Sequence, residues 1–180
     1  MTQYFFEEEL LKVKEQRKKV LNLFFVILAI YVLASVGIVI YYTTLPYTKP
    51  DTITLVKVIH HVITAIMVIF SLIYLGIVYK RVNDYYKMTV NLKTGLKETS
   101  TATFLRYDDD IQNKDGVDCK ALIFSEWNKY KKDYYERKVL VFYEKDYPEL
   151  KENQTVRFIT QSNLLVSYEI IENQNIEEKN

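Results

Sequence analysis

Two stretches decide the fold of this chain: LFFVILAIYVLASVGIVIYY at residues 23–42 and VIHHVITAIMVIFSLIYLGIVY at residues 58–79. Neither stretch contains an Asp, Glu, Lys or Arg. At a rise of about 1.5 Å per residue, twenty apolar residues form a helix of roughly 30 Å, which matches the hydrocarbon core of a bilayer. The sequence therefore predicts two transmembrane helices, over 20–42 and 55–80.

Basic residues flank these two spans unevenly. Five precede the first span and five follow the second, whereas the short connection between them carries only Lys49 and Lys57. Because an excess of Lys and Arg marks cytoplasmic segments, both termini are predicted to be cytoplasmic and the loop 43–54 extracytoplasmic. We therefore expect a multi-pass protein of the cell membrane. The ten flanking residues are Lys12, Lys14, Arg17, Lys18, Lys19, Lys80, Arg81, Lys87, Lys93 and Lys97.

Polar segments precede and follow the predicted hairpin. In the cytoplasmic leader 1–19, Phe6, Leu10 and Val13 recur at helical spacing, which predicts an amphipathic helix. Such a helix either lies along the inner leaflet or simply extends the first span. The connector 81–99 is predicted to begin as a helix and to break near Gly95.

From Ser100 onward the pattern changes to that of β-strands. Asp115-Gly116 and Gln161-Ser162-Asn163 indicate tight turns, residues 146–153 have room for one helical turn, and 172–180 read as a flexible tail. Five short strands favour a small β-barrel of OB or SH3-like type over 100–171, and the alternative is an open sheet packed on the connector helix. The fold class is thus α+β, a membrane hairpin followed by a cytoplasmic β domain. The expected strands are 101–107, 117–124, 134–143, 155–161 and 164–171.

The residue types exclude most catalytic chemistry from the β domain. Both histidines of the chain lie in the second span, and Cys119 is the only cysteine. A Ser-His-Asp or Cys-His nucleophile and a His-containing zinc site are therefore excluded there. Neither GxxxxGK nor GxGxxG occurs. We expect no catalytic residue, no metal and no cofactor, and hence a protein that is not an enzyme.

The two histidines, His60 and His61, are ionisable groups inside a predicted span, which suggests haem ligation or proton relay. Adjacent helical residues point about 100° apart, so both cannot bind one metal from the same side. The interpretation we favour places them, with Lys57, at the outer headgroup level, where they are hydrated.

Asp108, Asp109 and Asp110, followed by Asp115 and Asp118, form the one carboxylate cluster of the sequence. Calcium prefers such oxygen ligands, but the spacing does not match an EF-hand loop. A solvated hairpin loop explains the acidic run more simply, and we favour that explanation.

A basic and aromatic segment, 126–138, is the best candidate contact surface. From Asp84 onward the chain has 15 basic and 18 acidic residues, which argues against nucleic acid as a partner. Contact with anionic headgroups or with a protein is the better functional interpretation, but a solvated hairpin tip is the simpler explanation and the one we favour from the sequence. The candidate contact residues are Trp127, Lys129, Tyr130, Lys131, Lys132 and Arg137.

The layout of a membrane hairpin followed by a small C-terminal barrel is similar to that of NfeD-type proteins, although the glycine-rich barrel pattern of that family is absent here. The sequence favours a non-enzymatic membrane-anchored adaptor or accessory subunit, with membrane lipids, a larger membrane protein or a second copy of itself as partner. The alternative is a haem- or quinone-linked redox or transport component that uses His60 or His61. The Lys-, Asn-, Ile- and Tyr-rich composition hints at a prokaryotic source.

Overall fold

The computed structural model describes residues 1–5, 7–46, 48 and 50–171. The chain divides into two compact units, one of residues 13–83 and one that combines residues 1–12 with residues from 84 onward. The predicted tail 172–180, and Phe6, Tyr47 and Lys49, lie outside the described residues.

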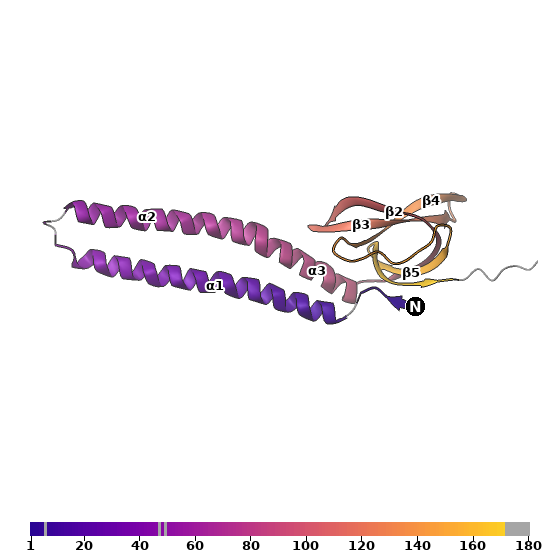
Figure 1. The fold of residues 1–180 in the computed structure, drawn as a ribbon, viewed down its shortest axis with the longest axis horizontal. Helices are drawn as coiled ribbons and strands as arrows, with labels where there is room; N and C mark the ends of the chain where they lie inside the picture. The colour runs from indigo at the N-terminus through magenta and orange to yellow at the C-terminus, as the bar shows by residue number, and fades with distance from the viewer. Residues whose placement is uncertain (6, 47, 49, 172–180) are drawn as a thin grey trace, which may run out of the picture. The chain divides into compact units, whose positions relative to one another are not determined.

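The first unit is a helical hairpin (Figure 1). Two of the described helical stretches, Glu8–Thr44 and Pro50–Thr94, are long and apolar enough to cross a membrane. Only 6% of the apolar window in each is buried, which differs from the buried core helix of a soluble protein. The two apolar helices are thus confirmed by length and composition. Their elements are α1 (Glu7–Thr44), α2 (Pro50–Ile73), the π-helical segment η1 (Tyr74–Tyr79) and α3 (Lys80–Thr94).

Polar side chains, most of them tyrosines, join the two arms of the hairpin. The hydrogen bonds run from Tyr31 Oη to Thr64 Oγ1 (3.0 Å), from Tyr74 Oη to the Val20 carbonyl (2.9 Å) and from the Arg17 guanidinium to Tyr79 Oη (3.3 Å). Near these bonds the Phe24 ring stacks on Phe70 and on Tyr74. These hydrogen bonds and ring contacts join the two arms of the hairpin.

The second unit contains a β-barrel, built by β2 (Glu98–Lys114), β3 (Val117–Asn128), β4 (Asp133–Phe142), β5 (Thr155–Gln161) and β6 (Leu164–Ile170). Strands β2, β3 and β4 form an antiparallel meander, and β5 pairs with both β2 and β6. A parallel pairing of β4 with β6 at Leu140 and Leu164 closes the barrel. Within the described residues, β2 to β6 thus form a closed five-stranded barrel (Figure 1), and the alternative of an open sheet is wrong.

Two tight turns set the hairpins of the barrel. Asp115 and Gly116 have φ angles of 51° and 84°, and Ser162 and Asn163 have φ angles of 50° and 67°. Positive φ at both central residues is what a two-residue hairpin loop of type I′ requires, so both predicted turns are confirmed. The helical turn considered for residues 146–153 is absent, because this described segment runs without regular structure.

The barrel has two apolar cores, on opposite faces of its strands. The side chains inside the barrel form an interior core, and those on the outer face of β3, β4 and β6 form an outer core that α3 and Phe5 cover. Strand β3 contributes to both cores, so residues 121–124 are all buried. The interior core is Ala102, Phe104, Leu122, Phe124, Val139, Val141, Leu150, Val156, Phe158 and Leu165. The outer core is Phe5, Met88, Leu92, Val117, Cys119, Ala121, Ile123, Leu140, Phe142, Leu164 and Val166.

The first residues of the chain are extended rather than helical. Strand β1 (Thr2–Gln3) pairs with β6, and the Lys145 ammonium holds both the Tyr4 carbonyl (2.9 Å) and the Glu9 carboxylate (2.6 Å). Helix α1 begins only at Glu7. A helix from the start of the leader was therefore the wrong expectation, because Phe5 gains burial in the outer core when this segment extends.

Candidate functional site

The hairpin tip between β3 and β4 is held in one shape by Asn128, the last residue of β3. Its side-chain oxygen accepts hydrogen bonds from the backbone nitrogens of Tyr130 (2.9 Å) and Lys131 (3.1 Å). Its carbonyl accepts from the Lys132 nitrogen (2.9 Å), and Lys132 has a φ of 52°. A turn fixed by a short polar side chain in this way presents its other side chains outward.

Aromatic rings and lysines are exposed together at this tip. Tyr130 is 99% exposed, and Tyr134 and Trp127 are 66% and 48% exposed. Trp127 and Tyr134 are cross-strand partners whose rings meet edge to face, with centroids 4.9 Å apart. Lys129, Lys131 and Lys132 are all exposed. The structure thus brings five of the six candidate contact residues together on one surface, which we call the β3–β4 tip (residues 127–134).

The sixth candidate, Arg137, is buried inside one end of the barrel. Its guanidinium donates to Glu126 (2.9 Å), Glu98 (2.8 Å), Ser100 (2.8 Å) and Thr160 (3.2 Å). The side chain is only 9% exposed, so it is not presented on the surface of the tip. Arg137 instead ties together the walls of the barrel, since its partners lie on β2, β3 and β5.

Strand alternation explains this position of Arg137. Side chains two residues apart on a strand share a face, so Arg137 has the same inward direction as Val139 and Val141 of the interior core. Glu126 stands in the same relation to Phe124. Burial alone would raise the pKa of Glu126, but hydrogen bonds from Arg137 and Tyr135 outweigh it and lower that pKa below its ordinary value. Alternation was the signal in the sequence that could have identified Arg137 as internal.

The two histidines of α2 differ in their surroundings. His61 Nδ1 lies 2.6 Å from the Lys57 carbonyl, within its own helix. His60 Nδ1 is buried and has no hydrogen-bond partner among the described residues. The two rings are nearly perpendicular, at 81°, with centroids 6.3 Å apart. Their divergence agrees with the expectation that they cannot share a ligand from one side.

The acidic run of β2 is spread along an irregular part of the strand. The pairing of β2 with β3 shifts register between Asp108 and Gln112. Asp108 pairs with Lys138 at 3.0 Å, which leaves it engaged rather than open to a cation. In the part of the chain that the structure describes, no group of three or more His, Cys, Asp or Glu side chains could hold a metal ion.

Cys119 is fully buried in the outer core. Burial raises the pKa of its thiol to about 11. Because the thiolate is the nucleophile, a thiol that stays protonated and shielded at neutral pH behaves as a small apolar side chain.

No protein-family model, curated protein or solved structure matches this chain. The functional interpretation therefore depends on the geometry described above.

Proposed function

We propose that this protein is a non-enzymatic, membrane-anchored adaptor whose β3–β4 tip contacts anionic lipid headgroups. In this proposal the helical hairpin is a two-pass anchor in the cell membrane with both termini in the cytoplasm. In the same proposal the barrel is of the OB type, which is supported by the return of β5 to β2 and by the parallel pairing of β6 with β4. The barrel would then act at the inner leaflet.

The observation that carries this proposal is the exposure of Tyr130, Trp127 and Tyr134 among three lysines. Large aromatic side chains are seldom displayed together on a surface that contacts only water. Tyrosine and tryptophan favour headgroup depth, where one side of the ring is apolar and the other is hydrated. Lysines beside them are attracted to an anionic leaflet by about 1 kcal/mol each.

Because the barrel is anchored to the membrane in this proposal, a weak affinity of the β3–β4 tip for headgroups is sufficient. A barrel tied to a membrane helix through α3 meets the membrane surface at a high effective concentration, so the tip needs little intrinsic affinity. One hairpin can therefore carry all the contact residues. The rest of the domain does not need a positive charge, and from Asp84 onward the chain has an acidic excess.

Trp127 is the only tryptophan of the chain, so its fluorescence reports on the tip alone. With the full chain in nanodiscs, we expect its emission to move to shorter wavelength when phosphatidylglycerol is added to phosphatidylcholine. Changing Lys129, Lys131 and Lys132 to Gln removes about 3 kcal/mol of attraction and should abolish the shift. High salt should reverse the shift in the unmodified protein, because salt screens exposed charges.

Lys151→Gln is the control, since Lys151 is exposed but lies outside the tip. It should leave the emission shift unchanged. Emission that is the same in both lipid compositions would contradict lipid contact. A shift seen in native membranes but in neither type of nanodisc would instead assign the tip to a protein partner and make this chain an accessory subunit.

A second candidate function is favoured by His60. Its unpartnered, buried Nδ1 atom is the kind of group that a haem or a quinone would engage. If haem is the ligand, the protein purified with haem supplied should show a Soret band that His60→Ala removes and His61→Ala retains. A spectrum without that band would end the haem form of this candidate.

A further inference from the structure

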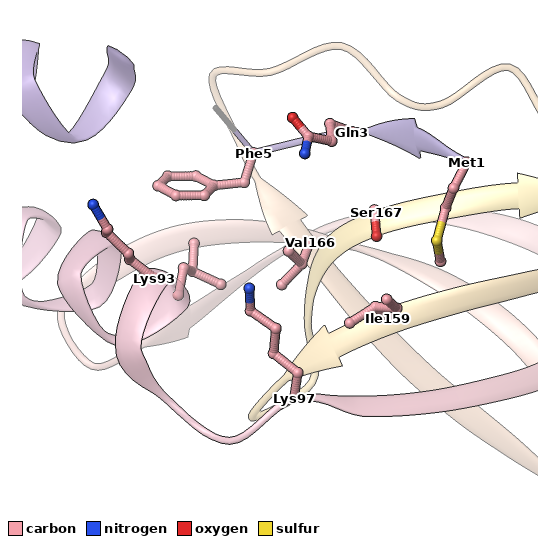
Figure 2. A pocket seen from close by; sticks show the side chains of 9 residues that line it. Met1, Gln3, Phe5, Lys93, Lys97, Ile159, Val166 and Ser167 are labelled. Carbon is pink, nitrogen blue, oxygen red and sulfur yellow. The ribbon is translucent and has the colours of Figure 1, made fainter. Parts of the chain in front are cut away.

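A cavity of about 440 Å³ opens in the barrel unit between β1, the end of α3 and the β5–β6 hairpin (Figure 2). This volume lies within the range of sites that hold small molecules. The cavity lies outside the β3–β4 tip and shares no residue with it.

The floor of the cavity is apolar and already formed. Phe5 and Val166 belong to the outer core and are each 8% exposed, and Ile159 packs against that core. Because these side chains are fixed by packing with α3 and β6, the cavity does not need to be assembled when a ligand arrives. Such preorganisation lowers the entropic cost of binding.

Polar groups without partners line the same cavity. The Ser167 residue is 7% exposed, and none of the described residues hydrogen-bonds its hydroxyl. Figure 2 shows that hydroxyl on the side of Ile159, and the Lys97 ammonium directed toward Val166. No ion pair or hydrogen bond joins the Lys97 ammonium to any residue that the structure describes.

The carboxylate next to Lys97 in the sequence is engaged elsewhere: Glu98 pairs with Arg137 at 2.8 Å. A cation and a hydroxyl donor therefore line one cavity with an apolar floor, and Gln3 adds an amide at its edge. Groups that donate hydrogen bonds suit an anion, and the floor suits hydrocarbon.

We propose that this cavity binds a small amphiphilic anion, with its head at Lys97 and Ser167 and its apolar body against Phe5, Ile159 and Val166. The head is a carboxylate or a phosphate. A free fatty acid and an anionic membrane lipid share this chemistry, so the test must distinguish the two sources.

The Ile159 methyl group provides the probe, by NMR of the isotope-labelled full chain in phosphatidylcholine nanodiscs. Octanoate should shift the Ile159 methyl signal in a saturable way, whereas acetate and inorganic phosphate should not, because they lack the apolar body. Lys97→Gln should weaken octanoate binding about tenfold, which corresponds to the loss of one charge-assisted hydrogen bond at an open site. Ser167→Ala should weaken it less.

Lys151→Gln is again the matched control and should bind octanoate like the unmodified chain. If the occupant is a bilayer lipid, the Ile159 signal should move when phosphatidylglycerol is added without octanoate, and Lys97→Gln should suppress that change. Both results support an amphiphilic anion and assign its source. The proposal is overturned if neither ligand moves the signal, or if Lys97→Gln and Lys151→Gln bind octanoate equally.

Discussion

Replacing Arg137 with alanine is expected to lower the free energy of unfolding of the barrel by about 3–5 kcal/mol. The guanidinium is almost fully buried, and its removal leaves Glu126, whose side chain is 19% exposed, without its cation. An uncompensated buried charge is among the costliest changes a core can suffer. For a domain of this size, the loss corresponds to a fall in the melting temperature of about 15 °C or more, measurable by circular dichroism.

The control for this variant is Arg106→Ala. Arg106 also makes a bidentate ion pair, with Glu136 at 2.9 and 3.0 Å, but both side chains are more than half exposed. Surface pairs of this kind contribute about 1 kcal/mol or less. The double variant Arg137→Ala with Glu126→Gln also removes the unpaired negative charge of Glu126, so it should recover part of the lost stability. Equal melting temperatures for Arg137→Ala and Arg106→Ala would show that the buried cluster is not what stabilises this end of the barrel.

Replacing Leu92 with alanine is expected to cost about 2–5 kcal/mol, because it opens a cavity between α3 and the outer face of the barrel. Leu92 is fully buried in the outer core, whereas the interior core lies on the other face of the strands. The effect should therefore be greatest on the protection of α3 amides. Hydrogen exchange measured by mass spectrometry on the full chain resolves α3 from the strands.

Leu96→Ala is the matched control, since Leu96 lies just beyond α3 and is 96% exposed. A surface substitution away from special features changes stability by about 0.5 kcal/mol or less. If Leu92→Ala left the exchange of α3 as slow as Leu96→Ala does, the outer core would contribute little to holding α3 on the strands.

Features that depend on neighbouring residues could be predicted from the sequence. The two apolar helices follow from uncharged stretches, and the hairpin turns follow from Asp115-Gly116 and from Ser162-Asn163, whose backbones adopt positive φ. The end of α3 at Gly95 follows in the same way, because a Cβ there would lie 2.6 Å from the Asn91 carbonyl. In each case the physical cause acts within a few residues.

Features that depend on distant partners could not be predicted in this way. Strand β1 is two residues long and carries no strand pattern of its own, and it exists only because β6 offers a partner. The exposed tip was visible as a basic and aromatic run, whereas the cavity was not. Its walls come from β1, α3, β5 and β6, and only the folded chain brings Lys97 beside Ser167.

The pairing of β1 with β6 restricts how this chain can be threaded through a bilayer. Thr2 and Gln3 are hydrogen-bonded neighbours of Tyr168 and Ser167, so both ends of the barrel unit must occupy the same compartment. Between them the chain can traverse a membrane only an even number of times, whatever the distribution of its basic residues. If the hairpin is the membrane anchor proposed above, its two helices must therefore insert together, and β1 can pair with β6 only once β6 has been synthesised.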